Sequence, residues 1–405
     1  MEAITKQYLE LFAEHSQELR ECPQLLGHYR EGAYDTFARL GLPRFKSEDY
    51  QRTDLAKLFA GDWKLLLSEG SPYWASHAFP QGIFIGSLSD FVRLYPEVAK
   101  EHYGRIASVE TDALVALNTL FTAEGFVVYV PRGAKMPGHI ELRSILPSRA
   151  GHISVERALI IVEDDAEATL YFEDCPEETG RAMALRTLEV YVGRRARFTL
   201  IDREESSAER IRITSTYVRQ MKQSAVDLSG LTLANGTTRN NFFIKLAEEE
   251  ADLKVSGFSL TAGSAHSDNF SFIEHAVPHC TSDELFKYIL RDESRGVFTG
   301  RILVAQDAQK TQAYQNNRNL LLSPSARMQS KPQLEIYADD VKCSHGMTTG
   351  QLSEEALFYM RQRGISLEEA RLMLSNAFAE DVLARIPVEE LAETLRSRVE
   401  ERLRR

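Results

Sequence analysis

A thiol and an imidazole lie two residues apart near the end of the chain, at Cys343 and His345. They belong to residues 337–346, which close a strand-rich region and precede a helical tail. If this stretch is extended, both side chains point to one face and can reach one metal ion or one partner surface. A buried cysteine beside a hydrogen-bonded histidine would give the same pattern, so two ligands alone do not define a site.

The densest group of possible metal ligands is His266, His275, His279 and Cys280. Imidazole and thiolate together suit zinc, iron or copper, so a stand-alone metal-binding protein is one interpretation. The spacing matches no standard zinc finger, and Pro278 indicates a bend just before His279 and Cys280. Histidines whose hydrogen bonds are satisfied in the core or at the surface are the competing interpretation.

A polar run rich in Gln and Asn lies between Leu303 and Leu320. Such side chains could line a binding surface. In a repeating β structure they also bond to the backbone and to each other, and this structural interpretation is favoured.

The chain lacks the common nucleotide motifs. It contains neither GxxxxGK followed by Ser or Thr nor GxGxxG after a strand, so we expect it to bind no nucleotide and to depend on a partner for any energy input. It also lacks GxSxG and HExxH, which argues against a serine hydrolase and a zincin.

The composition is that of a soluble globular chain, with 405 residues of which 43% are hydrophobic and 26% charged. A net charge of −11 argues against general binding to nucleic acid or to an anionic membrane surface. We expect a cytoplasmic protein, because the N-terminus has no apolar signal region and no apolar run is long enough to span a membrane. The four cysteines form no CxxC pair, which fits a reduced intracellular protein.

The hydrophobic pattern changes along the chain. Residues 1–60 have helical periodicity, and residues 60–105 are mixed. From residue 126, short β-type runs follow one another without a clear helix between them, which leaves a sandwich, a barrel or a solenoid. The runs are 126–130, 159–162, 169–172, 188–192, 198–201, 211–218, 242–246 and 253–260.

A repeat within these runs favours the solenoid. Small residues followed by alternating apolar positions recur at Ala166, Ala196, Ser224 and Ala251, at intervals of 30, 28 and 27 residues, with a weaker copy at Ala134. In a solenoid each coil buries its apolar face against the next, and small residues fit where the chain turns a corner. An antiparallel sandwich is the competing interpretation.

The helical period returns after residue 351. Ser353 caps one predicted helix, and Ser366 opens the capping box of a second, which carries an apolar stripe from Ala370 to Val382. A third helix follows. The expected domains are an N-terminal helical region over 1–105, a β-helix core over 106–350 and a C-terminal helical domain over 351–405.

Short motifs in the C-terminal half form a recognisable series. They are His275, 280–287 (CTSDELFK), 296–300 (GVFTG), 308–311 (AQKT), 315–317 (QNN), 320–323 (LLLS), 332–336 (PQLEI), 340–346 (DVKCSHG) and 357–365 (LFYMRQRGI), with 41–43 (GLP) and 46–53 (KSEDYQRT) near the N-terminus. The series resembles the SufB/SufD family, scaffold components of the SUF machinery for iron–sulfur cluster assembly. The resemblance is continuous over residues 265–387.

The match favours one branch of this family. SufB-like chains carry a cysteine in the segment that matches residues 315–323 and acidic residues beside the histidine that matches His345. This chain has no cysteine there, and Ser344 and Gly346 flank its histidine. The pattern favours the SufD branch and argues against a chain that builds a cluster alone.

The resemblance implies a right-handed parallel β-helix between helical segments, and a non-catalytic scaffold. It implies pairing with a SufB-like paralogue through the β-helix ends, where His345, Cys343 and the partner's thiolate would transiently hold iron or a nascent cluster. It also implies docking of a SufC-like ATPase on the C-terminal helices. The candidate docking residues are Phe358, Tyr359, Arg361, Arg363, Gly364, Leu374, Phe378 and Val382. A homodimer of the isolated chain and the binding of a flavin are left open.

Two alternatives belong to other classes of protein. One is the stand-alone metal-binding protein described above. The other is a carbohydrate-active β-helix enzyme, which would need carboxylates clustered along one groove. Such enzymes are usually secreted, and we find no signal peptide in this chain.

Overall fold

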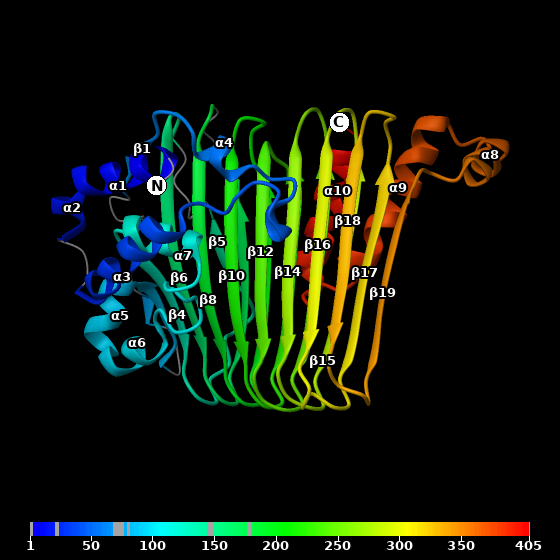
Figure 1. Ribbon diagram of the computed structural model, residues 1–405. Helices are drawn as coiled ribbons and strands as arrows, with labels where there is room; N and C mark the ends of the chain where they lie inside the picture. Colours follow the sequence, from blue (N-terminus) through cyan, green and yellow to red (C-terminus); the bar gives the residue numbers. More distant parts are fainter. Residues whose placement is uncertain are drawn as a thin grey trace.

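The computed structural model describes residues 3–20, 24–67, 77–78, 82–143, 149–175 and 180–404. They form a solenoid of parallel strands with helices towards both ends of the chain (Figure 1). The expected class, a mainly β parallel solenoid flanked by helical segments, is confirmed. None of the described helices is long and apolar enough to cross a membrane.

The strands form two sheets, and successive strands of the solenoid alternate between them. Sheet A has the order β18-β16-β14-β12-β10-β8-β6-β4-β3-β2 with β1 beside β6, and sheet B has the order β19-β17-β15-β13-β11-β9-β7-β5. The strands are β1 (Lys64–Leu66), β2 (His77–Ala78), β3 (Phe84–Ser87), β4 (Gly125–Val130), β5 (Ile140–Arg143), β6 (His152–Val162), β7 (Glu167–Asp174), β8 (Met183–Val192), β9 (Arg197–Glu205), β10 (Ile211–Gln220), β11 (Ala225–Ala234), β12 (Thr237–Leu246), β13 (Asp252–Thr261), β14 (His266–His275), β15 (Thr281–Leu290), β16 (Arg295–Val304), β17 (Gln312–Leu321), β18 (Arg327–Ile336) and β19 (Lys342–Gly350).

Helices precede and follow the solenoid. They are α1 (Ala3–Glu14), α2 (Ser16–Arg20), α3 (Gln24–Leu40), a 3₁₀ turn (Glu48–Tyr50), α4 (Leu55–Phe59), α5 (Leu88–Leu94), α6 (Pro96–His102), α7 (Ala113–Phe121), α8 (Glu354–Gln362), α9 (Leu367–Leu383) and α10 (Glu389–Arg404). The predicted caps are confirmed, since the Ser353 and Ser366 hydroxyls accept hydrogen bonds from the N–H groups of Ala356 and Glu369.

The same corner precedes each strand of sheet B from β5 to β17. There a residue with left-handed backbone is followed by a small buried one, and the carbonyl of that buried residue accepts a hydrogen bond from the next coil, as from Arg197 N–H to Ala166 O (2.9 Å). The pairs are Gly133-Ala134, Asp165-Ala166, Arg195-Ala196, Gln223-Ser224, Glu250-Ala251, His279-Cys280 and Lys310-Thr311. The predicted repeat of small residues is therefore confirmed, and it extends to Cys280 and Thr311.

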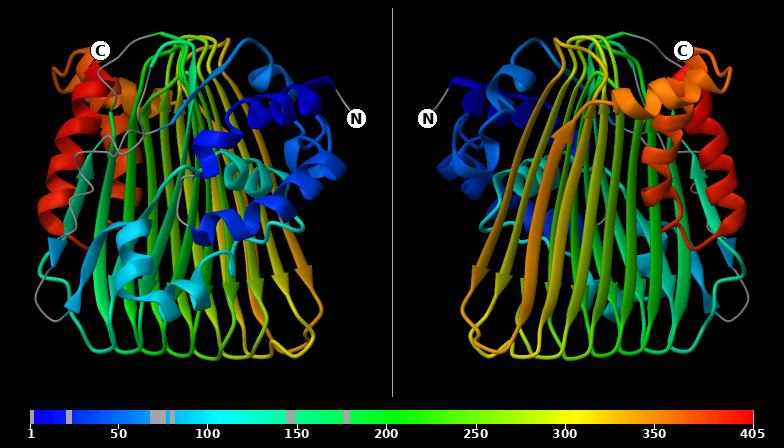
Figure 2. Two further views of the ribbon diagram at one scale, coloured as in Figure 1. Left: turned by 90° about the vertical axis from the view of Figure 1, so that its left-hand side faces the viewer. Right: turned by 90° about the vertical axis from the view of Figure 1, so that its right-hand side faces the viewer.

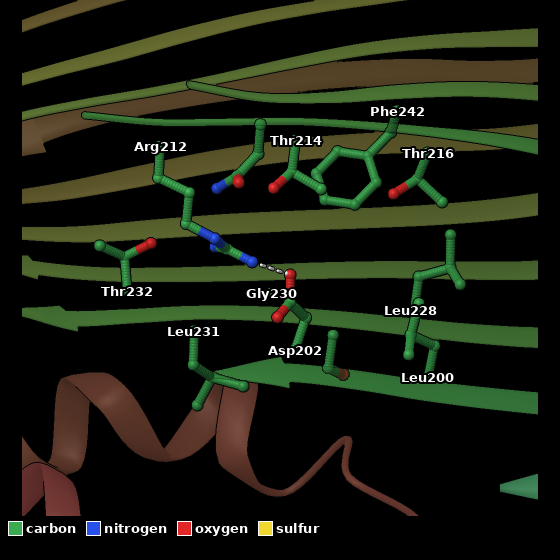
Figure 3. A pocket seen from close by; sticks show the side chains of 12 residues that line it. Leu200, Asp202, Arg212, Thr214, Thr216, Leu228, Gly230, Leu231, Thr232 and Phe242 are labelled. Atoms are coloured by element: carbon green, nitrogen blue, oxygen red, sulfur yellow. Dashed lines mark hydrogen bonds and ion pairs between the residues drawn. The ribbon is translucent and has the colours of Figure 1, made fainter. Parts of the chain in front are cut away.

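The interior of the solenoid is apolar near this corner and polar towards the other end of the strands. On β9, Leu200 belongs to the apolar core, whereas Asp202, two residues further, accepts hydrogen bonds from the buried Arg186 (2.8 Å) and Arg212. Beside the Asp202–Arg212 pair is a cavity of about 20 Å³, room for one water molecule (Figure 3). Charged groups persist inside the core because they are paired there.

Helices cover the outer faces of the two sheets. The N-terminal helices, with α7 against the sheet, pack on sheet A through apolar residues such as Leu117 and Leu185. On sheet B, α9 and α10 pack through residues such as Val382 and Leu395, and the buried Lys287 binds the Asp381 carboxylate (2.6 Å). Figure 2 shows these helical groups on opposite flanks of the solenoid.

A segment of the N-terminal region, residues 44–54, crosses the outer face of sheet A; we call it the strap. Its contacts run from β12 to β18: Tyr50 over Arg239, Thr53 to Asp268 and His266, Asp49 to Arg301, and Glu48 to Lys331 and Gln333 (each 3.2 Å). The strap therefore ties the N-terminal region to the last coil.

One interior carboxyl group has no arginine beside it. Glu284 on β15 is fully buried and accepts a hydrogen bond from Gln315 Nε2 (2.6 Å). Burial raises the pKa of Glu284 from 4.5 to about 7. As pH rises above 4.5 the unfolded chain loses this proton, whereas the folded chain retains it until about pH 7. The folded state therefore loses stability across this range.

We predict that Glu284→Gln removes part of this pH dependence. The free energy of unfolding of the variant minus that of the parent chain should be about 3 kcal/mol larger at pH 8 than at pH 4.5, so that the variant is relatively more stable at pH 8, because one pKa unit corresponds to about 1.4 kcal/mol. Urea unfolding at the two pH values measures the difference. Glu293→Gln, in an exposed turn, is the control. An identical pH dependence in parent and Glu284→Gln would contradict the prediction.

Candidate functional site

The last coil of the solenoid is open. Strand β18 pairs with β16 and strand β19 with β17, and within the described chain no further strand pairs with either. Figure 2 shows this end of the solenoid facing the viewer in its right-hand view, with α8 beside it. The apolar side chains of Ile336, Tyr337 and Met347 are exposed here. Unpaired edge strands with apolar side chains form a template for another β chain.

Cys343 and His345 are both on the open strand. The stretch is extended, as expected, and its register places Cys343 beside Ala313 and His345 beside Gln315. Because Ala313 and Gln315 are fully buried, this series of positions lies on the interior side of the sheet. Cys343 packs partly against the apolar core, and burial raises the pKa of its thiol. The His345 side chain is exposed at the open end.

The polar run before Leu320 has the structural role that was favoured from the sequence. Alternate residues of β17 point inward and form hydrogen bonds: Asn317 Nδ2 donates to Phe286 O (3.1 Å), and Asn319 Nδ2 donates to Thr349 Oγ1 (3.1 Å). Gln315 continues the series and donates to Glu284. The sequence did not reveal Glu284 and Gln315 as neighbours of His345. The amides at every second position of β17, Gln315, Asn317 and Asn319, could have indicated that Gln315 points inward.

The other group of possible ligands is dispersed. His266 lies on the outer side of β14, where its Nε2 bonds to Thr53 Oγ1 (2.9 Å), and His275 lies on the inner side, where its Nε2 bonds to Ser282 Oγ (2.8 Å). His279 and Cys280 form one of the repeated corners. Among the described residues, no group of three or more His, Cys, Asp or Glu side chains is placed to hold a metal ion.

The cysteines have different surroundings. Cys22 lies outside the described residues. Burial raises the pKa of the Cys175 thiol to about 11 and also raises that of Cys280. Cys343, at the open end, is the remaining thiol.

The candidate docking residues divide between two environments. Phe358 and Tyr359 on α8 are 62% and 60% exposed, and none of the residues of this fully described helix is buried. The Arg363 guanidinium donates to the Tyr359 hydroxyl (3.1 Å). The remaining candidates lie as follows: Arg361 in the last turn of α8, Gly364 at the turn after it with φ 84°, Leu374 and Phe378 half-buried on α9, and Val382 buried against sheet B.

Comparison with known proteins identifies the family. Residues 145–378 match the model described as SUF system FeS cluster assembly, SufBD core domain, and residues 2–71 and 71–142 match that of the SufBD protein N-terminal region.

Full-length relatives agree with these matches. An iron–sulfur cluster assembly SufBD family protein of Synechocystis is 30% identical over 92% of this chain and 90% of its own length. The iron–sulfur cluster assembly protein SufD of Escherichia coli is 27% identical over 95% and 93%. The chloroplastic protein ABCI7 of Arabidopsis thaliana is 30% identical over 79% and 69%. Since the core model covers more than half of the chain, this protein belongs to the SufB/SufD family of the SUF system for iron–sulfur cluster assembly.

Proposed function

We propose that the chain is a non-catalytic scaffold subunit of SUF iron–sulfur cluster assembly, of the SufD branch, and that it pairs with a SufB-like paralogue through the open end of the solenoid. The observation that carries this proposal is the last coil, whose edge strands expose backbone, apolar side chains and His345 together. The similarity to SufD along nearly the whole chain supports the choice of branch.

The ligands at this end are too few for a complete site. A neutral imidazole binds borderline metals such as iron, whereas clusters are held mainly by thiolates. His345 is exposed, but Cys343 is half-buried and has a raised pKa, so its thiolate is the less available of the two ligands. The cargo, iron or a nascent cluster, is therefore shared with ligands of the partner. His345 is the principal metal ligand that this chain contributes to the shared site.

A SufC-like ATPase docks on the C-terminal helices in this proposal. Helix α8 presents Phe358 and Tyr359 outward and follows β19 after a connection of only three residues. A partner that displaces α8 therefore pulls directly on the strand that carries Cys343 and His345. Helices α9 and α10 are fixed to sheet B, for example by the pairs of Glu205 with Arg398 (2.8 Å) and Arg402 (2.6 Å). They supply the rigid support against which such a movement occurs.

We predict that His345→Ala leaves the complex assembled but lowers its cluster transfer to a target enzyme roughly tenfold or more, since a metal ligand is lost. Size-exclusion chromatography checks assembly, and the activity of an iron–sulfur target enzyme measures transfer. Ser344→Ala, on the neighbouring position of β19, is the control. Normal transfer by the His345→Ala complex would refute the interface role.

Replacing the exposed aromatic pair tests the docking surface. The double variant Phe358→Ser with Tyr359→Ser should lose co-purification with the ATPase and retain the SufB-like partner, because both side chains are exposed and support no core. Leu94→Ser, which removes an exposed leucine of α5 at the other end of the molecule, is the control and should retain both partners. Undiminished ATPase binding by the double variant would place the docking site elsewhere.

The proposed movement of β19 predicts that ATP changes the reactivity of Cys343. In the assembled complex, a maleimide should label Cys343 faster with ATP than without it, because displacement of the strand exposes the half-buried thiol. Cys343→Ser identifies the signal by mass spectrometry of the labelled peptide. Equal labelling rates in the two states would exclude the movement.

A further inference from the structure

A column of polar side chains leads through the interior of the last coils to His345. In the parallel registers, Glu284 on β15 pairs with Gln315 on β17, and Gln315 pairs with His345 on β19. Neighbouring strands are about 4.8 Å apart, so each side chain can reach the next one in the column. Glu284 and Gln315 are both fully buried.

The amide of Gln315 is held in one orientation. Its Nε2 donates to Glu284 Oε2 (2.6 Å), so the nitrogen side of the amide is directed towards β15. Gly300, on the opposite sheet, makes room for it: a Cβ added there would lie 2.3 Å from Nε2. The amide oxygen Oε1 is buried and has no hydrogen-bond partner among the described residues. A buried carbonyl oxygen without a hydrogen-bond partner destabilises the folded state.

A column further along the same two strands shows that an amide on β17 can bond to the side chain paired with it on β19. Asn319 Nδ2 donates to Thr349 Oγ1 (3.1 Å), a hydrogen bond between side chains that are paired in register on β17 and β19. The column that contains Gln315 has His345 at the equivalent place on β19. A neutral imidazole has one N–H group, which can donate, and one unprotonated nitrogen, which can bind a metal.

We infer that Gln315 is a positioning residue for His345: when the exposed imidazole turns towards β17, Oε1 of Gln315 accepts its N–H, which fixes one tautomer and directs the other ring nitrogen out of the open end. Glu284 acts one step further back, by holding the amide of Gln315. Histidines that ligate metals usually donate their second ring nitrogen to such an acceptor, which sets both tautomer and orientation. This inference rests on the proposed role of His345 for its functional consequence, but the hydrogen bond belongs to the chain itself.

The hydrogen bond is tested in the isolated full-length chain. With ¹⁵N-labelled histidine, and with His345→Ala to assign the signal, the His345 ring nitrogens should show a single tautomer at pH 8. Gln315→Leu, which has no acceptor, should give averaged shifts of two tautomers, as should Gln315→Asn, whose amide is one methylene shorter. Glu284→Gln retains an acceptor for the Gln315 amide and should keep the parent spectrum.

The chain offers a matched control. Gln220 on β10 is also fully buried, its Nε2 donates to Ser224 Oγ (3.3 Å) and its Oε1 has no partner among the described residues, but its column does not contain His345. Gln220→Leu should leave the His345 signal unchanged. If the signal is the same in Gln315→Leu, Gln315→Asn and the parent chain, the inference is wrong.

The functional arm is a double-mutant cycle in the assembled complex. Gln315→Leu should lower cluster transfer about 10–100-fold in the parent background and have no further effect when His345 is already alanine. An equal loss in both backgrounds would show that Gln315 acts through stability and would overturn its positioning role. If His345→Ala itself transfers clusters normally, the proposed function fails, whereas the spectroscopic arm still decides whether the hydrogen bond exists.

Discussion

The corner that precedes the strands of sheet B from β5 to β17 governs the remainder of the structure. A left-handed backbone conformation is unfavourable for a residue with a side chain, and the chain adopts it at Asp165, Arg195, Gln223, Glu250, His279 and Lys310. The hydrogen bonds between successive corners offset this strain, and the small side chain that follows leaves room for the turn. Since all the corners coincide, the strands stay in register, and equivalent inward positions of successive coils form straight columns.

The side chains in these columns determine which parts of the interior are apolar and which are charged. Columns of Leu or Val contribute to an ordinary apolar core, whereas columns of the two sheets that bring Asp202 against Arg186 and Arg212 form a buried charge network. Each such charge is tolerated only because its partner is supplied by a neighbouring coil. The same arrangement places Glu284 and Gln315 behind His345. A side chain at the open end is thus supported by residues contributed by two earlier coils.

The sequence predicted the solenoid because alanine and serine mark most of its corners, at Ala134, Ala166, Ala196, Ser224 and Ala251. It did not predict the corners at Cys280 and Thr311, because those residues are larger or suggest other chemistry. His279 and Cys280 were grouped as metal ligands for that reason, although their backbone geometry is that of a corner. The sequence also did not predict the column of Glu284, Gln315 and His345. Its members are about 30 residues apart at unequal intervals, and only the strand registers align them.

The strap has a consequence for the order in which the molecule is completed. Glu48 contacts Lys331, and these residues are 283 positions apart in the sequence. During synthesis the N-terminal region emerges first, yet the last part of its binding surface does not exist until the ribosome has added β18. The strap can therefore make its full set of contacts only after β18 has been added. Because β18 is the end strand of sheet A, closing the strap is coupled to the completion of that sheet.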